Sequence, residues 1–267
     1  MKEFAGKVAV ITGGASGIGK AMALDFARRG MHLVLADVET ATLEQTAQEV
    51  RGHGAEVLTV RCDVSDRQQV FDLADKSFER FGAVHVLCNN AGVAVGGLLQ
   101  DATHEDWTWV LNVNLWGVIH GVEAFVPRLI AQQQEAHIVN TSSMAGLIAS
   151  SGLGVYNTSK YAVVGLSETL RKDLRDHRIG VSVLCPMGVQ TRITESQRNR
   201  PEDLQATGQP EDVPLLLGRY LEVEEVSRRV IDAIEHNEQY IPTHYEGREF
   251  FERRAQRILE AFDKLQE

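Results

Sequence analysis

Short runs of aliphatic and β-branched residues alternate with longer amphipathic stretches through the first two thirds of this chain, and that alternation limits the folds open to it. A strand run, a helical stretch and another strand run predict parallel strands joined by right-handed crossovers. The runs are almost continuously apolar, which is typical of a sheet covered on both faces. They are residues 7–12, 32–37, 56–61, 83–88, 136–141 and 180–185.

After the sixth run the alternation weakens. Residues 191–218 are polar, and we expect such a long segment to be a lid over bound substrate. An amphipathic helix over 223–236, a short strand near 240–241 and a charged helical tail over about 247–265 follow. We predict one α/β domain over 1–267, a doubly wound parallel sheet of about seven strands with helices on both faces and a ligand at the carboxyl ends of the strands.

Polar residues ahead of the helical stretches predict where the helices begin. Thr42 and Ser65 each precede a Gln by three residues, which is the spacing of a capping box. Thr103 opens a long helix that we expect to run to Gln132, and a further helix is expected over Val155–Asp176.

Charge balance and cysteine usage narrow the function classes. The chain has 27 Lys and Arg against 37 Asp and Glu, a net charge of −10, whereas nucleic acids and anionic membranes recruit dense basic patches. The longest uncharged stretch, 138–159, is too polar for a membrane span. The three cysteines lack CxxC spacing and no signal-peptide pattern opens the chain, so we expect a reducing, cytoplasmic location. Nine histidines without ligand spacing predict no metal site.

A glycine-rich turn, TGGASGIG at residues 12–19, directly follows the first strand run. Its glycines would let the backbone approach a pyrophosphate, which the next helix would bind with its free N–H groups. Asp37 lies 18 residues past Gly19, where a carboxylate can accept both hydroxyls of an adenosine ribose. A turn or capping aspartate is the alternative for Asp37. Together these features predict a dinucleotide site.

Asp37 also favours NAD over NADP, because a 2′-phosphate beside this carboxylate would meet like charge. Ser16 and Val38 offer no compensating cation. Lys20 and Arg28 belong to the following helix, where a solvated face explains their charge.

Tyr156 and Lys160 are four residues apart on an expected helix, so both side chains lie on one face. Ser143 follows the fifth strand run and therefore lies at the same edge of the sheet as the glycine turn. A nearby ammonium group and a positive nicotinamide ring would both lower the pKa of a tyrosine toward neutrality, as a general base requires. A surface Tyr–Lys pair without a role is the alternative.

These motifs, in this order from about Lys7 to Thr191, resemble those of the short-chain dehydrogenase/reductase family of NAD(P)-dependent oxidoreductases. The resemblance implies a single-domain Rossmann fold and a catalytic tetrad of Asn114, Ser143, Tyr156 and Lys160. With the glycine turn, it implies a cofactor site made of Gly13, Ser16, Gly17, Ile18, Gly19, Asp37, Val38, Asp63, Val64, Asn90, Ala91, Gly92, Tyr156, Lys160, Pro186, Gly188, Val189 and Thr191.

By the same resemblance, Ser143 would polarise the substrate oxygen and Tyr156 would exchange a proton with it. Lys160 would bind the nicotinamide ribose and lower the pKa of Tyr156, and Asn114 would position a water that links Lys160 to solvent. The implied reaction is reversible hydride transfer between NAD and a secondary alcohol or ketone. In the family, the helices that correspond to residues 105–132 and 155–176 form a dimer interface. We therefore expect a homo-oligomer, either a dimer or a tetramer.

The sequence departs from the family pattern after Pro186, where Met187 stands at a position that is usually glycine. We expect this residue to narrow the substrate pocket, which we assign to Val95, Ala145, Leu153 and Met187. Their apolar character favours a hydrophobic or aromatic substrate. A catalytically silent NAD-binding sensor or scaffold, and a lyase or isomerase that uses NAD without net turnover, are the rival interpretations.

Overall fold

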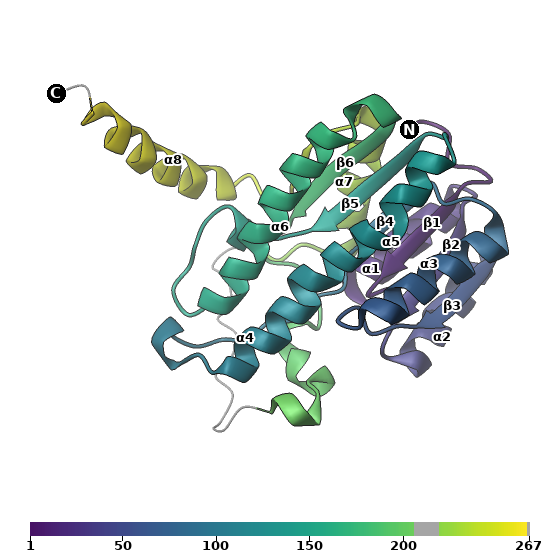
Figure 1. Ribbon diagram of the computed structural model, residues 1–267, viewed down its shortest axis with the longest axis horizontal. Coiled ribbons are helices and arrows are strands. Elements are labelled where there is room, and N and C mark those ends of the chain that lie inside the picture. The colour runs from purple at the N-terminus through teal and green to yellow at the C-terminus, as the bar shows by residue number, and fades with distance from the viewer. Residues whose placement is uncertain (206–218, 266–267) are drawn as a thin grey trace.

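Seven parallel strands form a sheet in the order β3-β2-β1-β4-β5-β6-β7, which confirms the predicted doubly wound fold (Figure 1). The computed structural model describes residues 1–205 and 219–265. The strands are β1 (Val8–Thr12), β2 (His32–Asp37), β3 (Val57–Arg61), β4 (Val86–Asn89), β5 (Ala136–Thr141), β6 (Ile179–Cys185) and β7 (Tyr240–Pro242).

Helices cover both faces of this sheet, because each strand presents apolar residues on both sides. On one face α1, α2 and α7 bury Phe26, Leu43 and Ile231 against the sheet, and on the other α3 and α5 bury Leu73 and Phe125. The helices are α1 (Gly17–Arg28), α2 (Thr40–Arg51), α3 (Arg67–Phe81), α4 (His104–Leu111), α5 (Gly117–Ala131), α6 (Gly154–Asp173), α7 (Val223–His236) and α8 (Gly247–Asp263).

Two of the expected helix caps are wrong, by three residues for α2 and by one for α3. Helix α2 begins at Thr40, and its N-cap residue is Glu39 instead of Thr42. Helix α3 is capped by Asp66, whose carboxylate accepts the N–H groups of the second and third helical residues, and not by Ser65. Thr103 does cap α4 and forms a capping box with Asp106. An acidic side chain accepts such N–H groups as readily as a hydroxyl does, which explains the cap at Asp66. The Glu39 side chain makes no capping hydrogen bond, so no cap signal marks the start of α2.

The expected long helix after Thr103 is interrupted by one turn of π-helix at Asn112–Trp116, which joins α4 to α5. The helices on the two sides of this turn pack in different apolar clusters. Trp109 and Val110 of α4 pack in a small cluster at the edge of the sheet, whereas Phe125 and Leu129 of α5 pack on the sheet itself.

The segment after β6 and the end of the chain carry the remaining differences. Residues 191–205 of the expected lid contain two short 3₁₀ helices, Ile193–Asn199 and Glu202–Leu204, while 206–218 lie outside the described residues. Helix α8 extends away from the sheet (Figure 1). Within the described ranges, no helix is both long and apolar enough to cross a membrane.

Two helical glycines differ sharply in the space around them. A Cβ on Gly121 of α5 would lie 2.2 Å from Oδ1 of the buried Asn89, at the end of β4. A Cβ on Gly165 of α6 would meet no atom within 4 Å. Close packing of α5 on β4 therefore depends on the missing side chain at Gly121.

We predict that Gly121→Ala lowers the free energy of unfolding by about 1–3 kcal/mol, the usual effect of overpacking a buried contact. Gly165→Ala is the matched control, and it should raise stability by about 0.5–1 kcal/mol because alanine is the better helix former. Urea titration of both variants measures the difference. Equal effects of the two substitutions would contradict the packing argument.

Candidate active site

A cleft of about 510 Å³ opens at the carboxyl ends of the strands, with walls from both halves of the sheet. One end is formed by the glycine turn and by the residues that follow β2 and β3. The other end is formed by the residues that follow β4, β5 and β6 and by the first turns of α6. This is where a doubly wound sheet binds its ligand, because the chain leaves β1 and β4 in opposite directions.

The glycine turn is pressed against the loop after β4. Gly13 has a φ of 67°, and a Cβ there would lie 2.9 Å from the Cα of Ala91. The Thr12 hydroxyl accepts the N–H groups of Asn90 and Ala91 at 3.0 and 3.1 Å. The Asn90 side chain in turn donates to the carbonyls of Thr12 and Gly13. These bonds fix the open backbone of the turn at the floor of the cleft.

Asp37 ends β2 and faces the glycine turn. Its Oδ2 accepts the N–H of Ala15 at 3.0 Å and its Oδ1 accepts the N–H of Glu39 at 3.0 Å. A carboxylate oxygen has more than one acceptor site, so each oxygen can still accept a ligand hydroxyl. The turn role of Asp37 is therefore observed and is compatible with ribose binding, which stays a prediction.

Ser143, Tyr156 and Lys160 come together at the other end of the cleft. The Ser143 hydroxyl donates to the Pro186 carbonyl at 3.2 Å and accepts the N–H of Ala145 at 3.1 Å. Lys160 is buried, and its Nζ donates to the Thr141 carbonyl at 3.0 Å and lies 5.5 Å from the centre of the Tyr156 ring. The end of β5 thus holds the ammonium through the Thr141 carbonyl, and Ser143 follows that strand end in the same cleft as the phenol.

Asn114 lies in the π-helical turn and is fully buried. Its amide accepts the N–H of Val93 at 2.8 Å and donates to the Val93 carbonyl and to the Ser159 hydroxyl at 2.9 and 3.1 Å. Ser159 in turn donates to the Tyr156 carbonyl at 2.7 Å. The Asn114 side chain therefore ties the loop after β4 to α6, and its expected positioning of a water stays a prediction.

Comparison with known proteins identifies the family. The short chain dehydrogenase family model matches residues 7–202. The chain is 34% identical over 272 residues to a CLA biosynthesis dehydrogenase/reductase of Lactiplantibacillus plantarum, with 97% of this chain and 95% of that protein covered. It belongs to the short-chain dehydrogenase/reductase family.

Two further similarities cover almost the whole dehydrogenase. A C alpha-dehydrogenase of Sphingobium is 35% identical over 268 residues, covering 98% of this chain and 88% of that protein. A crystal structure of a short-chain dehydrogenase/reductase from Burkholderia phymatum, in complex with NAD, matches with a TM-score of 0.94 and 44% identity, over 98% of this chain and 97% of that one. The chain is thus an oxidoreductase whose family acts on CH–OH groups.

The ionisable groups of this dehydrogenase are shifted by burial. Burial raises the pKa of Tyr156 to about 12, although the nearby Ser143 hydroxyl offsets part of the effect. Burial lowers the pKa of Lys160 to about 8. Without a bound cofactor, loss of water around the phenol thus sets the direction of the Tyr156 shift, and the expectation that Lys160 and a nicotinamide ring lower this pKa stays a prediction.

Most of the predicted site residues of the dehydrogenase line the cleft, and four do not. Gly19 lies behind the turn, where a Cβ would be 2.0 Å from the Gly13 carbonyl oxygen, so its role is packing. Asn114 lies behind the wall, as described above. Val95 packs in the cluster around Trp109, and Ala145 contributes its N–H to Ser143, so neither is a pocket residue.

Met187, at the departure from the family pattern, does line the cleft of the dehydrogenase. Its N–H donates to the Thr243 hydroxyl at 3.3 Å, and its side chain packs against the apolar cluster that contains Met144 and Val164. The larger side chain is therefore accommodated partly behind the wall. Leu153, the remaining predicted pocket residue, also lines the cleft.

Several lining residues had no sequence signal strong enough to single them out. Trp109 reads as one apolar residue of a helix, and Glu39 as a solvated charge near a helix start. Arg192 and Arg198 read as solvated charges of the polar segment 191–218. Further lining residues, Leu204 and Tyr220, lie far along the chain from the motifs. Among the residues the structure describes, no cluster of His, Cys, Asp or Glu is arranged to hold a metal ion.

We predict that Lys160→Met stabilises the protein without cofactor by about 2–3 kcal/mol at pH 7, because it removes a desolvated ammonium. The pKa of Lys160 is about 8 when folded and about 10.5 in its ordinary range, so the unfolded chain binds more protons between these values. The cost of burying the charge is therefore full below pH 8 and disappears as the pH rises toward 10.5. Denaturant unfolding of both proteins across this range measures the gain, and a pH-independent difference would contradict its electrostatic origin.

Proposed function

We propose that this protein transfers a hydride reversibly between NAD and a secondary alcohol or ketone of hydrophobic or aromatic character. The observation that carries the proposal is the meeting of Ser143, Tyr156 and Lys160 in a cleft whose other end holds the glycine turn and Asp37. Either group alone is compatible with other activities, but a proton-transfer site and a dinucleotide cradle in one cleft favour dehydrogenase chemistry.

The residues at the glycine turn fit a dinucleotide. Gly13 and Gly17 have φ values of 67° and 54°, which glycine adopts without strain, and the backbone here lies open to the cleft. Helix α1 begins at Gly17 with its N–H groups available to a pyrophosphate. Asp37 would accept the adenosine ribose hydroxyls and disfavour a 2′-phosphate, which supports NAD over NADP. When bound, the nicotinamide supplies the hydride acceptor or donor, and its oxidised form adds a positive charge that favours a phenolate.

The chain's own residues would manage the substrate oxygen and its proton. In oxidation, Tyr156 takes the hydroxyl proton of the alcohol, and in reduction it returns that proton to the carbonyl oxygen. The Ser143 hydroxyl, which can rotate away from the Pro186 carbonyl, donates a hydrogen bond to that oxygen. Lys160, held by Thr141, would bind the nicotinamide ribose and contribute positive charge beside Tyr156. Asn114 keeps the loop after β4 and helix α6 in register.

The wall around the catalytic residues supports an apolar substrate. Beyond Ser143 and Tyr156 it is lined mainly by apolar and aromatic side chains, namely Val93, Ala94, Trp109, Leu153, Met187, Pro201, Leu204 and Tyr220. An aryl or alicyclic group can bury its surface among them. Residues 191–218 are proposed as the lid over that group, and the described part of this segment contributes Pro201 and Leu204 to the wall.

We predict that the protein forms NADH from NAD with a subset of aryl, alicyclic and steroidal secondary alcohols. Tyr156→Phe should lower the rate by about 100-fold or more, since the proton acceptor is lost. Tyr161→Phe is the matched control, because Tyr161 is the next aromatic residue on α6 and lies against Arg254 outside the cleft. Absorbance of NADH measures both. Tight NADH binding without turnover of any alcohol would instead favour the sensor or scaffold interpretation.

We infer further that the protein is a homo-oligomer, a dimer or a tetramer. Helix α8 buries little against its own chain and exposes Phe250, Leu259, Phe262 and, just past its end, Leu265, the last two at 64% and 80%. Apolar surface of this kind on a soluble chain marks contact with another protein surface.

Phe262→Glu should lower the molecular mass measured by light scattering, because it places a charge in the apolar face of α8. Glu260→Gln, two residues earlier on the same helix, is the control that should leave the mass unchanged. A single-chain mass for the unsubstituted protein would contradict the oligomer.

A further inference from the structure

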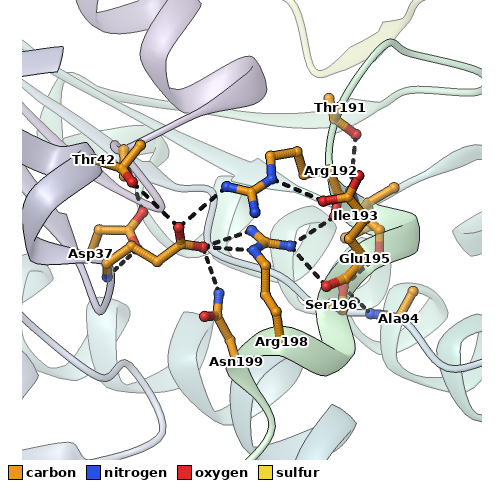
Figure 2. Close-up of polar contacts among 12 residues, drawn as sticks. Asp37, Thr42, Ala94, Thr191, Arg192, Ile193, Glu195, Ser196, Arg198 and Asn199 are labelled. Atoms are coloured by element: carbon orange, nitrogen blue, oxygen red, sulfur yellow. Dashed lines mark hydrogen bonds and ion pairs between the residues drawn. The ribbon is translucent and has the colours of Figure 1, made fainter. Parts of the chain in front are cut away.

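A carboxylate beside the ribose end of the cleft holds two guanidinium groups from the other half of the sheet (Figure 2). Glu39 follows Asp37 by two residues, and its side chain is 21% exposed. Its Oε1 lies 2.7 Å from Nη2 of Arg198 and accepts Nδ2 of Asn199 at 2.8 Å, while its Oε2 lies 3.4 Å from Nη1 of Arg192. All four residues line the cleft.

The two arginines are held by their own segment as well as by Glu39. The Nε of Arg192 donates to Glu195 at 3.0 Å, and Nη1 of Arg198 donates to the Arg192 and Glu195 carbonyls at 3.0 Å each (Figure 2). The segment is attached to the loop after β4, since the Ala94 N–H donates to the Ser196 hydroxyl at 3.1 Å. Two guanidiniums are thus fixed beside the end of β2 rather than spread over a mobile surface.

A second tether lies farther along the segment. The Arg200 side chain is 2% exposed and its Nη1 lies 2.7 Å from Oδ1 of Asp106, at the start of α4. This buried ion pair holds the segment to α4 independently of Glu39. Neutralising Glu39 would therefore release the charges of Arg192 and Arg198 without detaching the backbone that carries them.

The charges at this place bear on which dinucleotide the cleft would accept. A 2′-phosphate carries nearly two negative charges, and two arginines bind such a group through charge-assisted, bidentate hydrogen bonds. Asp37 by itself would oppose this attraction only in part. Burial raises the pKa of Glu39, but the hydrogen bonds from Asn199 and Arg198 and the charges of both arginines outweigh it, so the pKa is lowered and the carboxylate stays ionised.

We propose that Glu39 is a specificity-determining residue that excludes a 2′-phosphorylated dinucleotide by occupying Arg192 and Arg198. This inference rests on the proposed nicotinamide-dinucleotide function of the same cleft. Discrimination then depends on two carboxylates with different tasks. Asp37 recognises the free ribose hydroxyls, and Glu39 withholds the cations that would compensate a phosphate in their place.

Helix α2 does not depend on the Glu39 side chain. Glu39 is the N-cap residue of α2, but its carboxylate accepts no backbone N–H of the first turn, and the Thr42 hydroxyl donates to its Oε2 at a long 3.5 Å, a contact that a glutamine oxygen can also accept. Glutamine has nearly the same shape and keeps a carbonyl oxygen for Asn199, so Glu39→Gln removes the charge with little change in packing. An effect of this substitution on dinucleotide choice would therefore be electrostatic.

The test measures binding of NADH and of NADPH by isothermal titration calorimetry, which needs no substrate. Glu39→Gln should raise the ratio of NADPH affinity to NADH affinity by about tenfold to a hundredfold, the effect expected for charge-assisted hydrogen bonds. The triple substitution Glu39→Gln, Arg192→Gln and Arg198→Gln should return the ratio to that of the unsubstituted protein. Glu44→Gln is the matched control, because Glu44 also lies on α2 but pairs with Arg51 outside the cleft.

Each outcome has one meaning. A ratio that changes in Glu39→Gln no more than in Glu44→Gln overturns the inference, as does a shift that persists in the triple variant. A protein that binds neither dinucleotide contradicts the proposed function instead. Equal affinity of the unsubstituted protein for NADH and NADPH would contradict both the proposed NAD preference and the exclusion by Glu39. Preference for NADH with an unchanged Glu39→Gln ratio leaves the proposed function standing and removes only the role of Glu39.

Discussion

The parallel direction of all seven strands is the constraint on which the rest of this structure depends. Parallel strands bring every carboxyl end to one edge, so residues far apart in the chain meet there without long loops. Because β1 and β4 are neighbours whose following segments run to opposite sides, the edge is open between them. Thr12 and Asn90 close the bottom of that opening with hydrogen bonds between the two turns. The glycine turn, the phenol and the lysine therefore share one cleft as a consequence of topology.

The burial of Tyr156 and Lys160 opposes the ionisation states that the proposed mechanism needs. Tyr156 holds its proton more tightly and Lys160 less tightly than either would in water. Two hydrogen bonds hold Lys160 in place. Its Nζ donates to the Thr141 carbonyl, and the Ser142 hydroxyl donates to the Lys160 carbonyl. Charge brought by a ligand then acts on groups that are already in place, where weak dielectric screening makes each charge effective. Burying the Lys160 ammonium lowers the stability of the fold, and it holds the side chain in one fixed position.

The sequence was sufficient for what depends on local periodicity and on short motifs. All seven strands, the glycine turn, Asp37, and the Tyr156–Lys160 pair were predicted because each is encoded within a few neighbouring residues. Features that depend on contacts between residues far apart in the sequence were not predicted. Glu39 and Arg198 are separated by 159 positions, and Trp109 becomes a wall residue only through the fold. Val95 and Ala145 were assigned by nearness to a motif, but both are buried and neither lines the cleft. The cofactor and substrate roles remain predictions.

The π-helical turn between α4 and α5 changes which direction the side chains of each helix face. One extra residue in an α-helix rotates everything beyond it by about 100°, so the two halves are set out of phase. The front half directs Trp109 toward the small edge cluster, and the rear half directs Phe125 toward the sheet. If one residue of the π-helical turn were deleted to leave a continuous α-helix, α5 would rotate relative to α4, and Gly121 would no longer face Asn89. The π-helical turn therefore lets one continuous helical segment pack its two halves against two different apolar clusters.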